Sequence, residues 1–188
     1  MRGSKAGFTL IETLVAITML TTVIATIMSL VQTSLQANAY AQDQVVAKNL
    51  AEEGIEYIRN IRDVNMINGA NWLTSIAKDV SSPCGNIAGA GAQATCKVDP
   101  FTLAIPSTCT TSDNSCTLKY DSTNGRYTYA SGTLSKFKRS ITVQRVDQDS
   151  GSGLWFSVLV QSTVTWSEPT GTRTYVASEY LFNWYTGS

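Results

Sequence analysis

Glu12 is the only charged residue in a long apolar stretch of this chain. No other acidic or basic side chain occurs between Phe8 and Gln42. An ionised carboxylate within a membrane is costly unless it is paired with a cation. The stretch contains no cation of its own, but a cut just before Phe8 would create an α-amino group. We therefore predict charge pairing between Glu12 and such an amine, whereas the alternative is that Glu12 lies at the membrane interface and reaches the lipid headgroups.

Enzymatic chemistry finds little support in the composition. The 188 residues include no histidine, which is the commonest general base, a member of most nucleophilic triads and the most frequent transition-metal ligand. No nucleophile–base pair takes its place, so we expect a protein that is not an enzyme rather than a membrane-tethered hydrolase. Fourteen basic and fourteen acidic residues cancel, so no overall field favours nucleic acid as a partner.

The N-terminal part is predicted to span a membrane. Residues 13–42 carry no charge, and roughly 20 apolar residues suffice to cross a bilayer as a helix. We place the span at about residues 13–35, where the threonine hydroxyls should bond to backbone carbonyls one turn back. Arg2 and Lys5 precede the span, so we expect a cytoplasmic N-terminus with the bulk of the chain outside.

Residues 6–16 (AGFTLIETLVA) resemble the cleavage and methylation motif of type IV prepilins and type II secretion pseudopilins. The resemblance implies that residues 1–7 are a leader, which a prepilin peptidase removes after Gly7. It implies that Phe8 becomes the N-methylated first residue and that Glu12 neutralises the N-terminal amine of a neighbouring subunit during assembly. The implied partners are this peptidase, other pilin or pseudopilin subunits and an inner-membrane assembly platform.

The function implied by this resemblance is structural. We expect a subunit of a type IV pilus-like filament, most similar to a minor pilin, that starts as a single-pass membrane protein and enters an extracellular or periplasmic filament. The alternatives are a type II secretion pseudopilin and a singly anchored surface binding module that never polymerises. A conventional secretory signal ending at Ala37-Asn38-Ala39 is a further alternative. Its apolar region would be unusually long, and Glu12 would stay unexplained.

One helix is predicted from about Phe8 to Asp63. Its first half is the membrane span, and its second half is amphipathic, with apolar residues every three to four positions. These residues are Val46, Leu50, Gly54, Tyr57 or Ile58, and Ile61. Because glycine in a helix costs about 1 kcal/mol relative to alanine, Gly54 indicates close packing against a sheet or another helix.

Residues 64–188 are predicted to form a β-rich extracytoplasmic domain, with a short helix near residues 71–80. Strands at 118–120 and 127–129 flank Ser122-Thr123-Asn124-Gly125, a hairpin-turn signal. The chain is therefore predicted to have an α+β fold, with a long N-terminal helix packed on an antiparallel sheet, as in type IV pilins.

Alternation along the later strands predicts which side chains face the core. Three groups are predicted to face inward: Phe137, Ile141 and Val143; then Leu154, Phe156, Val158, Val160, Val164 and Trp166; and last Val176, Tyr180, Phe182 and Trp184. The pattern of residues 164–166 followed by 178–184 is similar to the last strands of minor-pilin-like proteins. Lys136, Lys138 and Arg139 are predicted to form an exposed basic cluster, more simply a solvated strand face than a surface for DNA.

Four cysteines lie in the same domain: Cys84, Cys96, Cys109 and Cys116. They fall on the predicted side of the membrane where disulfides persist, and three pairings are possible. We expect the sequential pairing, which closes the shortest loops and staples a loop-rich region. Zinc is the alternative, although the chain has neither a Cys-x-x-Cys pair nor a histidine.

No cofactor is expected. Residues 147–151 (DQDSG) are similar to the start of a calcium loop, but the bidentate glutamate of an EF-hand does not follow. A hairpin turn explains Asp147 and Asp149 equally well.

Overall fold

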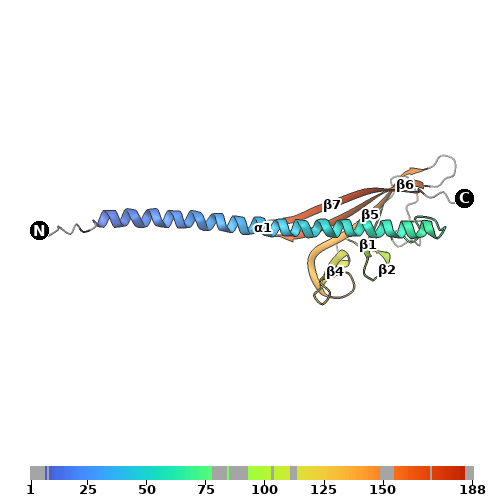
Figure 1. Cartoon of the computed structure of the whole chain (residues 1–188), viewed down its shortest axis with the longest axis horizontal. Coiled ribbons are helices and arrows are strands. Elements are labelled where there is room, and N and C mark those ends of the chain that lie inside the picture. Colours follow the sequence, from blue (N-terminus) through green and yellow to red (C-terminus); the bar gives the residue numbers. More distant parts are fainter. Residues whose placement is uncertain are drawn as a thin grey trace. The chain divides into compact units, whose positions relative to one another are not determined.

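The computed structural model describes residues 7, 9–77, 84, 93–102, 104–110, 114–148, 155–169 and 171–184. Within this part of the chain, one long helix precedes seven strands (Figure 1). The elements are α1 (Leu10–Ile67), β1 (Gln93–Asp99), β2 (Ala104–Thr108), the 3-10 helix η1 (Asn114–Cys116), β3 (Thr117–Asp121), β4 (Arg126–Thr128), β5 (Thr133–Gln148), β6 (Trp155–Glu168) and β7 (Gly171–Phe182). The pairs that these strands form are antiparallel. The predicted α+β fold is therefore confirmed.

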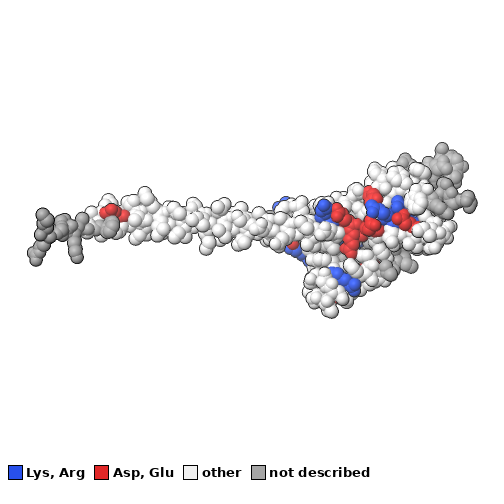
Figure 2. Space-filling model, in the orientation of Figure 1, with Lys and Arg blue, Asp and Glu red and all other residues white. Residues whose placement is uncertain are grey.

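The chain divides into two compact units, Met1–Asp43 and Gln44–Ser188, and α1 contributes to both. In the first unit, the large apolar side chains of the helix are exposed. Figure 2 shows this part of the helix without charged side chains apart from one acidic patch near its start, in agreement with the position of Glu12 in the sequence. The helix is long enough and apolar enough to cross a membrane.

The threonine hydroxyls of the first unit are bonded within the helix, as the sequence predicts. Thr18 donates to the Val15 carbonyl and Thr26 donates to the Val23 carbonyl, each at 2.8 Å. Further threonines along the same segment make equivalent bonds. These hydroxyls therefore need no water, which suits the segment to an apolar environment.

Helix α1 ends at Ile67, beyond the predicted end at Asp63. Gly69 follows in a left-handed conformation with a φ of 68°. The N–H groups of Gly69 and Ala70 donate to carbonyls of the last turn at 3.1 and 2.9 Å, which is the bond pattern of a Schellman cap. The helix passes Asp63 because its apolar stripe continues to Met66, which is buried in the core.

Strands β5 and β6 form the centre of the sheet. They pair along nearly their whole length, from Phe137 opposite Trp166 to Gln148 opposite Trp155. The other side of β5 pairs first with β3, which forms a hairpin with β4, and then with β1, which pairs with β2. Among the described strands β7 pairs with β6 alone, so β7 is an edge strand.

The predicted hairpin between β3 and β4 is confirmed. Tyr120 pairs with Tyr127 across the hairpin, and Gly125 has a φ of 65° in the turn. The Asp121 carboxylate accepts a hydrogen bond from the Asn124 side chain at 2.7 Å. This bond is the main cause that lowers the pKa of Asp121, so the turn holds that carboxylate in its charged form.

The part of α1 from Gln44 onward packs on one face of the sheet (Figure 1). Ile58 of the helix shares an apolar cluster with Val143 and Val160 of the sheet. Gly54 lies at the closest approach, because a Cβ there would stand 3.0 Å from Ile141 Cδ1 and 3.0 Å from Ser162 Oγ. The close packing predicted at Gly54 is therefore confirmed.

The inward face predicted for the last strand is wrong. Leu181 is buried, and the predicted inward residues are exposed instead: Val176, Tyr180, Phe182 and Trp184. The register with β6 is the reason, because Val158 and Val160 face the helix and pair with Leu181 and Glu179. Glu179 then forms an ion pair with Arg59 of α1. The odd-numbered residues of β7 therefore face the helix.

On β6 the predicted inward face holds for most positions. Buried there are Val158, Val160, Val164 and Trp166. Phe156 is exposed instead, because it lies near the start of the strand and its ring turns toward Phe182, with 6.0 Å between the ring centroids. Leu154 lies outside the described residues.

The helix predicted near residues 71–80 is also wrong where it can be compared. Residues 72–77 form consecutive turns, and residues 78–80 lie outside the described part of the chain. Ser75 has a φ of 61°, a left-handed conformation that interrupts an α-helix. Trp72 and Ile76 are nevertheless buried in the core, so the turns place apolar side chains without a helix.

Two disulfides join Cys84 to Cys96 and Cys109 to Cys116. This is the sequential pairing expected from the shortest loops. The four cysteines are buried, and each bridge ties a loop position to a regular element, β1 for Cys96 and η1 for Cys116. Closing such loops stabilises the fold by restricting the unfolded chain.

Candidate functional site

The candidate assembly site begins at Thr9, which caps helix α1. The Thr9 carbonyl accepts hydrogen bonds from the N–H groups of Glu12 and Thr13 at 3.1 and 3.2 Å. The Thr9 hydroxyl oxygen also accepts from the Glu12 N–H at 3.3 Å. Thr9 is therefore the N-cap, and Leu10 is the first helical residue.

Glu12 occupies the third helical position after this cap. Thr9 and Glu12 thus match the Thr-x-x-Glu pattern of a capping box, and a carboxylate in the first turn is favoured by the helix dipole. This second reason for an acidic residue is not among the sequence-based predictions, and the threonine three positions earlier was its signal in the sequence. The Glu12 side chain is exposed, and the nearest described cation along the chain is Lys48. The described part of this segment therefore supplies no cation for the Glu12 carboxylate.

Of the two residues at the predicted cleavage site, the structure describes Gly7. Gly7 lies in open space, where an added Cβ would meet no heavy atom within 4 Å. The predicted methylation site Phe8 and residues 1–6 lie outside the described part of the chain. The alternative cleavage site before Tyr40 lies within helix α1.

Arg139 does not belong to an exposed basic cluster, which corrects the prediction for Lys136, Lys138 and Arg139. The Arg139 side chain is fully buried, whereas Lys136 is exposed and Lys138 is partly exposed. Alternation along β5 is the reason, because Arg139 has the same parity as Phe137 and Ile141 on the face that meets α1. The parity of Arg139 in the sequence was the signal that could have placed it correctly.

The buried guanidinium joins three parts of the fold. Its Nη1 donates to the Leu50 carbonyl at 2.9 Å and to the Glu53 carboxylate at 3.0 Å, both on α1. Its Nη2 donates to the Val98 carbonyl of β1 at 2.7 Å. The guanidinium carbon lies 5.6 Å from the centroid of the Tyr129 ring. We call these five residues the Arg139 cluster; its bonds fix α1 against the sheet in one register.

Because Tyr129 belongs to the Arg139 cluster and is partly buried, we expect the free energy of unfolding to fall at high pH. Burial raises the pKa of Tyr129, so the unfolded chain releases this proton at a lower pH than the folded chain does. The free energy of unfolding should therefore be unaffected below about pH 10 and fall as the pH rises further. Tyr129→Phe should cost about 1 kcal/mol at pH 7, because it removes the 2.8 Å bond from the hydroxyl to the Arg139 carbonyl.

Denaturant unfolding of the two proteins at neutral and alkaline pH checks this expectation. The stability difference between the native chain and Tyr129→Phe should shrink above about pH 10. An equal difference at both pH values would contradict the assignment of the alkaline loss to Tyr129.

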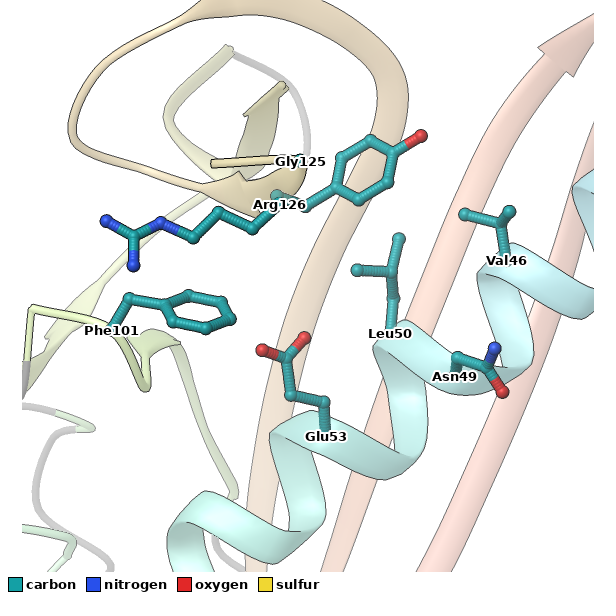
Figure 3. A pocket seen from close by; sticks show the side chains of 8 residues that line it. Val46, Asn49, Leu50, Glu53, Phe101, Gly125 and Arg126 are labelled. Atoms are coloured by element: carbon teal, nitrogen blue, oxygen red, sulfur yellow. The ribbon is translucent and has the colours of Figure 1, made fainter. Parts of the chain in front are cut away.

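An open hollow of about 390 Å³ lies beside the same part of α1 (Figure 3). Its lining residues are Val46, Asn49, Leu50, Glu53, Phe101, Gly125, Arg126 and Tyr127. The Arg126 guanidinium lies over the Phe101 ring, 4.7 Å from its centroid, and one Glu53 oxygen is held by Arg139. The charged groups are thus engaged by the protein itself, and the free surface of the hollow is mainly apolar.

The structure does not describe the acidic side chains of the possible calcium loop. Of Asp147 only the backbone, in β5, is described, and Asp149 lies outside the described residues. The calcium alternative stays a prediction.

Comparison with protein families identifies the N-terminal segment. Residues 2–28 match the family model described as the prokaryotic N-terminal methylation motif. No curated protein and no solved structure matches the chain. The match covers the predicted leader from Arg2 onward, the Gly7–Phe8 junction, Glu12 and the first part of α1.

The matched segment is a prepilin-type N-terminal motif. Together with the single described apolar helix, it supports the type IV prepilin and pseudopilin family and fits a membrane-anchored subunit. The motif implies processing by a prepilin peptidase and assembly with other pilin subunits, and the family that carries it is structural rather than enzymatic.

Proposed function

We propose that this chain is a structural subunit of a type IV pilus-like filament, of the minor pilin kind. The observation that carries the proposal is the N-terminal methylation motif at residues 2–28. The prepilin peptidase cuts after Gly7, and Phe8 becomes the methylated N-terminus. Residues 1–7 are thus the leader, and residues 64–188 form the extracytoplasmic domain.

Membrane insertion precedes assembly. Arg2 and Lys5 keep the N-terminus in the cytoplasm, and the span at about residues 13–35 holds the subunit until an inner-membrane platform takes it up. The two disulfides in the domain support an oxidising compartment on the far side of the membrane. The filament is then extracellular or periplasmic.

Assembly transfers the apolar helix from lipid into the filament core. Its exposed leucine, isoleucine and valine side chains pack against the helices of neighbouring subunits. Glu12 pairs with the N-terminal amine of an adjacent subunit, so only a subunit in the correct axial register avoids an unpaired buried charge.

Fractionation of the cells that produce this chain tests the proposal. The chain should be recovered in filaments sheared from the cells, and deletion of the prepilin peptidase should confine it to the membrane. Recovery in membranes alone, with the peptidase present, would contradict it and favour a singly anchored surface module. A pseudopilin carries the same motif; gene neighbours for a secretion channel would favour that assignment over a pilus.

A further inference from the structure

Strand β7 is an edge of the sheet that lacks the usual protection against pairing with another chain. Proteins protect edge strands with prolines, with bulges or by keeping them short. Two other strands at the ends of the sheet follow this rule, because β2 contains Pro106 and β4 has 3 residues. In contrast, β7 has 12 residues, contains no proline and pairs with β6 without a register shift. Its second edge has no partner among the described strands.

The described part of helix α1 does not cover this edge. The side chains of Tyr175, Ala177 and Glu179 lie on the helix side of β7 but are only partly buried, whereas Leu181 near the end of the strand is buried. On the opposite face Val176 is 48% exposed. Within the described part of the chain, the backbone of β7 is therefore accessible to a further strand.

The charged residues of β7 are arranged so that two copies of the strand complement each other. Arg173 and Glu179 lie on the same face, and Val176 lies midway between them. In an antiparallel pair with Val176 opposite Val176, Arg173 of each copy lies opposite Glu179 of the other, and opposite charges in this position stabilise a strand pair. Within the chain Arg173 pairs with Glu168 and Glu179 pairs with Arg59, yet the side chains of Arg173 and Glu179 are 48% and 32% exposed. Each can therefore contact a second charge.

The register that matches the charges also uses almost the whole strand. Val176 lies next to the centre of Gly171–Phe182, so pairing would extend from Gly171 opposite Leu181 to Leu181 opposite Gly171. A shift of two residues in either direction would place Arg173 opposite Ala177 or Leu181 and lose the charge pairs. Charge pairing and full overlap thus select the same register independently.

We infer that β7 pairs edge to edge with β7 of a second copy of this chain, antiparallel and with Val176 opposite Val176. The pairing joins the two sheets into one, with residues of the helix side opposite residues of the helix side. A peptide from another protein could bond to the same backbone edge. A copy of β7, however, brings an arginine and a glutamate with the required spacing on the required face.

The two copies in this pair run in opposite directions. Because α1 from Gln44 onward runs along β7 (Figure 1), the two Gln44 ends lie at opposite ends of the joined sheet. Subunits of one filament share a direction, so the contact joins two filaments that lie side by side and antiparallel. This consequence rests on the proposed function, whereas the strand pairing itself does not.

Disulfide cross-linking of the full chain in detergent micelles tests the pairing. The native cysteines are all in disulfides, so an introduced cysteine is the single free thiol. With micelles in excess over chains, Val176→Cys should form a cross-linked dimer on mild oxidation. The matched control is Thr172→Cys on the same face, whose two copies would stand about 27 Å apart and should cross-link at least tenfold less. If thermal unfolding shows Val176→Cys to be unstable, a mixture of Thr174→Cys and Ser178→Cys chains should cross-link instead.

Charge reversal tests the register. Added to Val176→Cys, Arg173→Glu places two glutamates opposite each other twice, because the pair is symmetric, and should lower the cross-linked fraction about tenfold or more. Glu179→Arg should do the same. A mixture of the two charge variants restores both opposite-charge pairs and should restore cross-linking, which would not occur if the variants were merely unfolded.

Three results would overturn the inference. The first is no cross-linking of Val176→Cys, or of the Thr174→Cys and Ser178→Cys mixture where that replaces it, above the Thr172→Cys control. The second is strong cross-linking of Thr172→Cys, which would indicate parallel copies. The third is failure of the mixed charge variants to recover. Recovery of the native chain in sheared filaments is measured separately, so a failure of the strand pairing is distinguishable from a failure of the proposed function.

Discussion

Glu12→Gln should lower the incorporation of this chain into filaments by about tenfold to 100-fold while leaving its level in the membrane unchanged. Glutamine is nearly isosteric with glutamate but cannot neutralise an amine. The amine of the neighbouring subunit would then be left unpaired in an apolar core, which is the costly state. The measurement is the ratio of this chain in sheared filaments to that in membranes.

The Glu12→Gln variant separates the two roles that Glu12 can have, which are pairing with an amine and capping the start of α1. Glutamine also fits the third position of a capping box, so the start of α1 should be intact in this variant. The matched control is Thr9→Ala, which removes the cap hydroxyl near the Glu12 N–H and keeps the charge. Normal incorporation of Glu12→Gln together with poor incorporation of a correctly processed Thr9→Ala would show that the cap matters and the charge does not.

Arg139→Met should reduce the free energy of unfolding by about 3–5 kcal/mol, because it removes one member of a buried ion pair. Glu53 would lose its cation, and the carbonyls of Leu50 and Val98 would lose their donors. The helix would then keep its apolar packing and the Arg59–Glu179 ion pair as its contacts with the sheet. Denaturant unfolding of the full chain in detergent, followed by the signal of the β-rich domain, gives the difference.

Two further variants show whether the Arg139–Glu53 ion pair is responsible for this loss of stability. Adding Glu53→Leu to Arg139→Met removes the stranded carboxylate and should recover part of the loss. Lys138→Met, on the partly exposed side of the same strand, should change the stability by less than about 0.5 kcal/mol. Equal losses for Arg139→Met and Lys138→Met would mean that the Arg139 cluster does not anchor the helix.

The features that depend on local chemistry could be predicted from the sequence. The apolar run predicts the long first part of α1 as a helix, and the Asn124-Gly125 pair predicts the β3–β4 hairpin because few residues accept its backbone conformation. Gly54 likewise predicts close packing, since nothing else offsets its cost in a helix. These inferences use residues that are near one another in the chain.

The features that depend on strand register could not be predicted. Alternation divides β7 into two faces but does not say which one meets the core, and both faces carry apolar residues. The set with Tyr180 and Phe182 has the larger apolar side chains, but the pairing with β6 places Leu181 on the buried face instead. Arg139 shows a related limit, because its charge suggests exposure whereas its parity with Phe137 and Ile141 places it on the helix side.

The end of α1 likewise depends partly on local sequence and partly on packing. Gly69 signals a C-cap locally, but the choice between Asp63 and Ile67 depended on whether Met66 lies in the core. Packing decided that question, because a buried apolar residue keeps the last turn helical.

The most direct test of the prepilin assignment is the intact mass and N-terminal sequence of the chain recovered from cell envelopes. We predict a chain that begins at Phe8 and carries one methyl group on its N-terminal nitrogen. A chain that begins at Met1, or one that begins at Tyr40, would contradict the assignment: the first would be a plain membrane anchor and the second an exported domain.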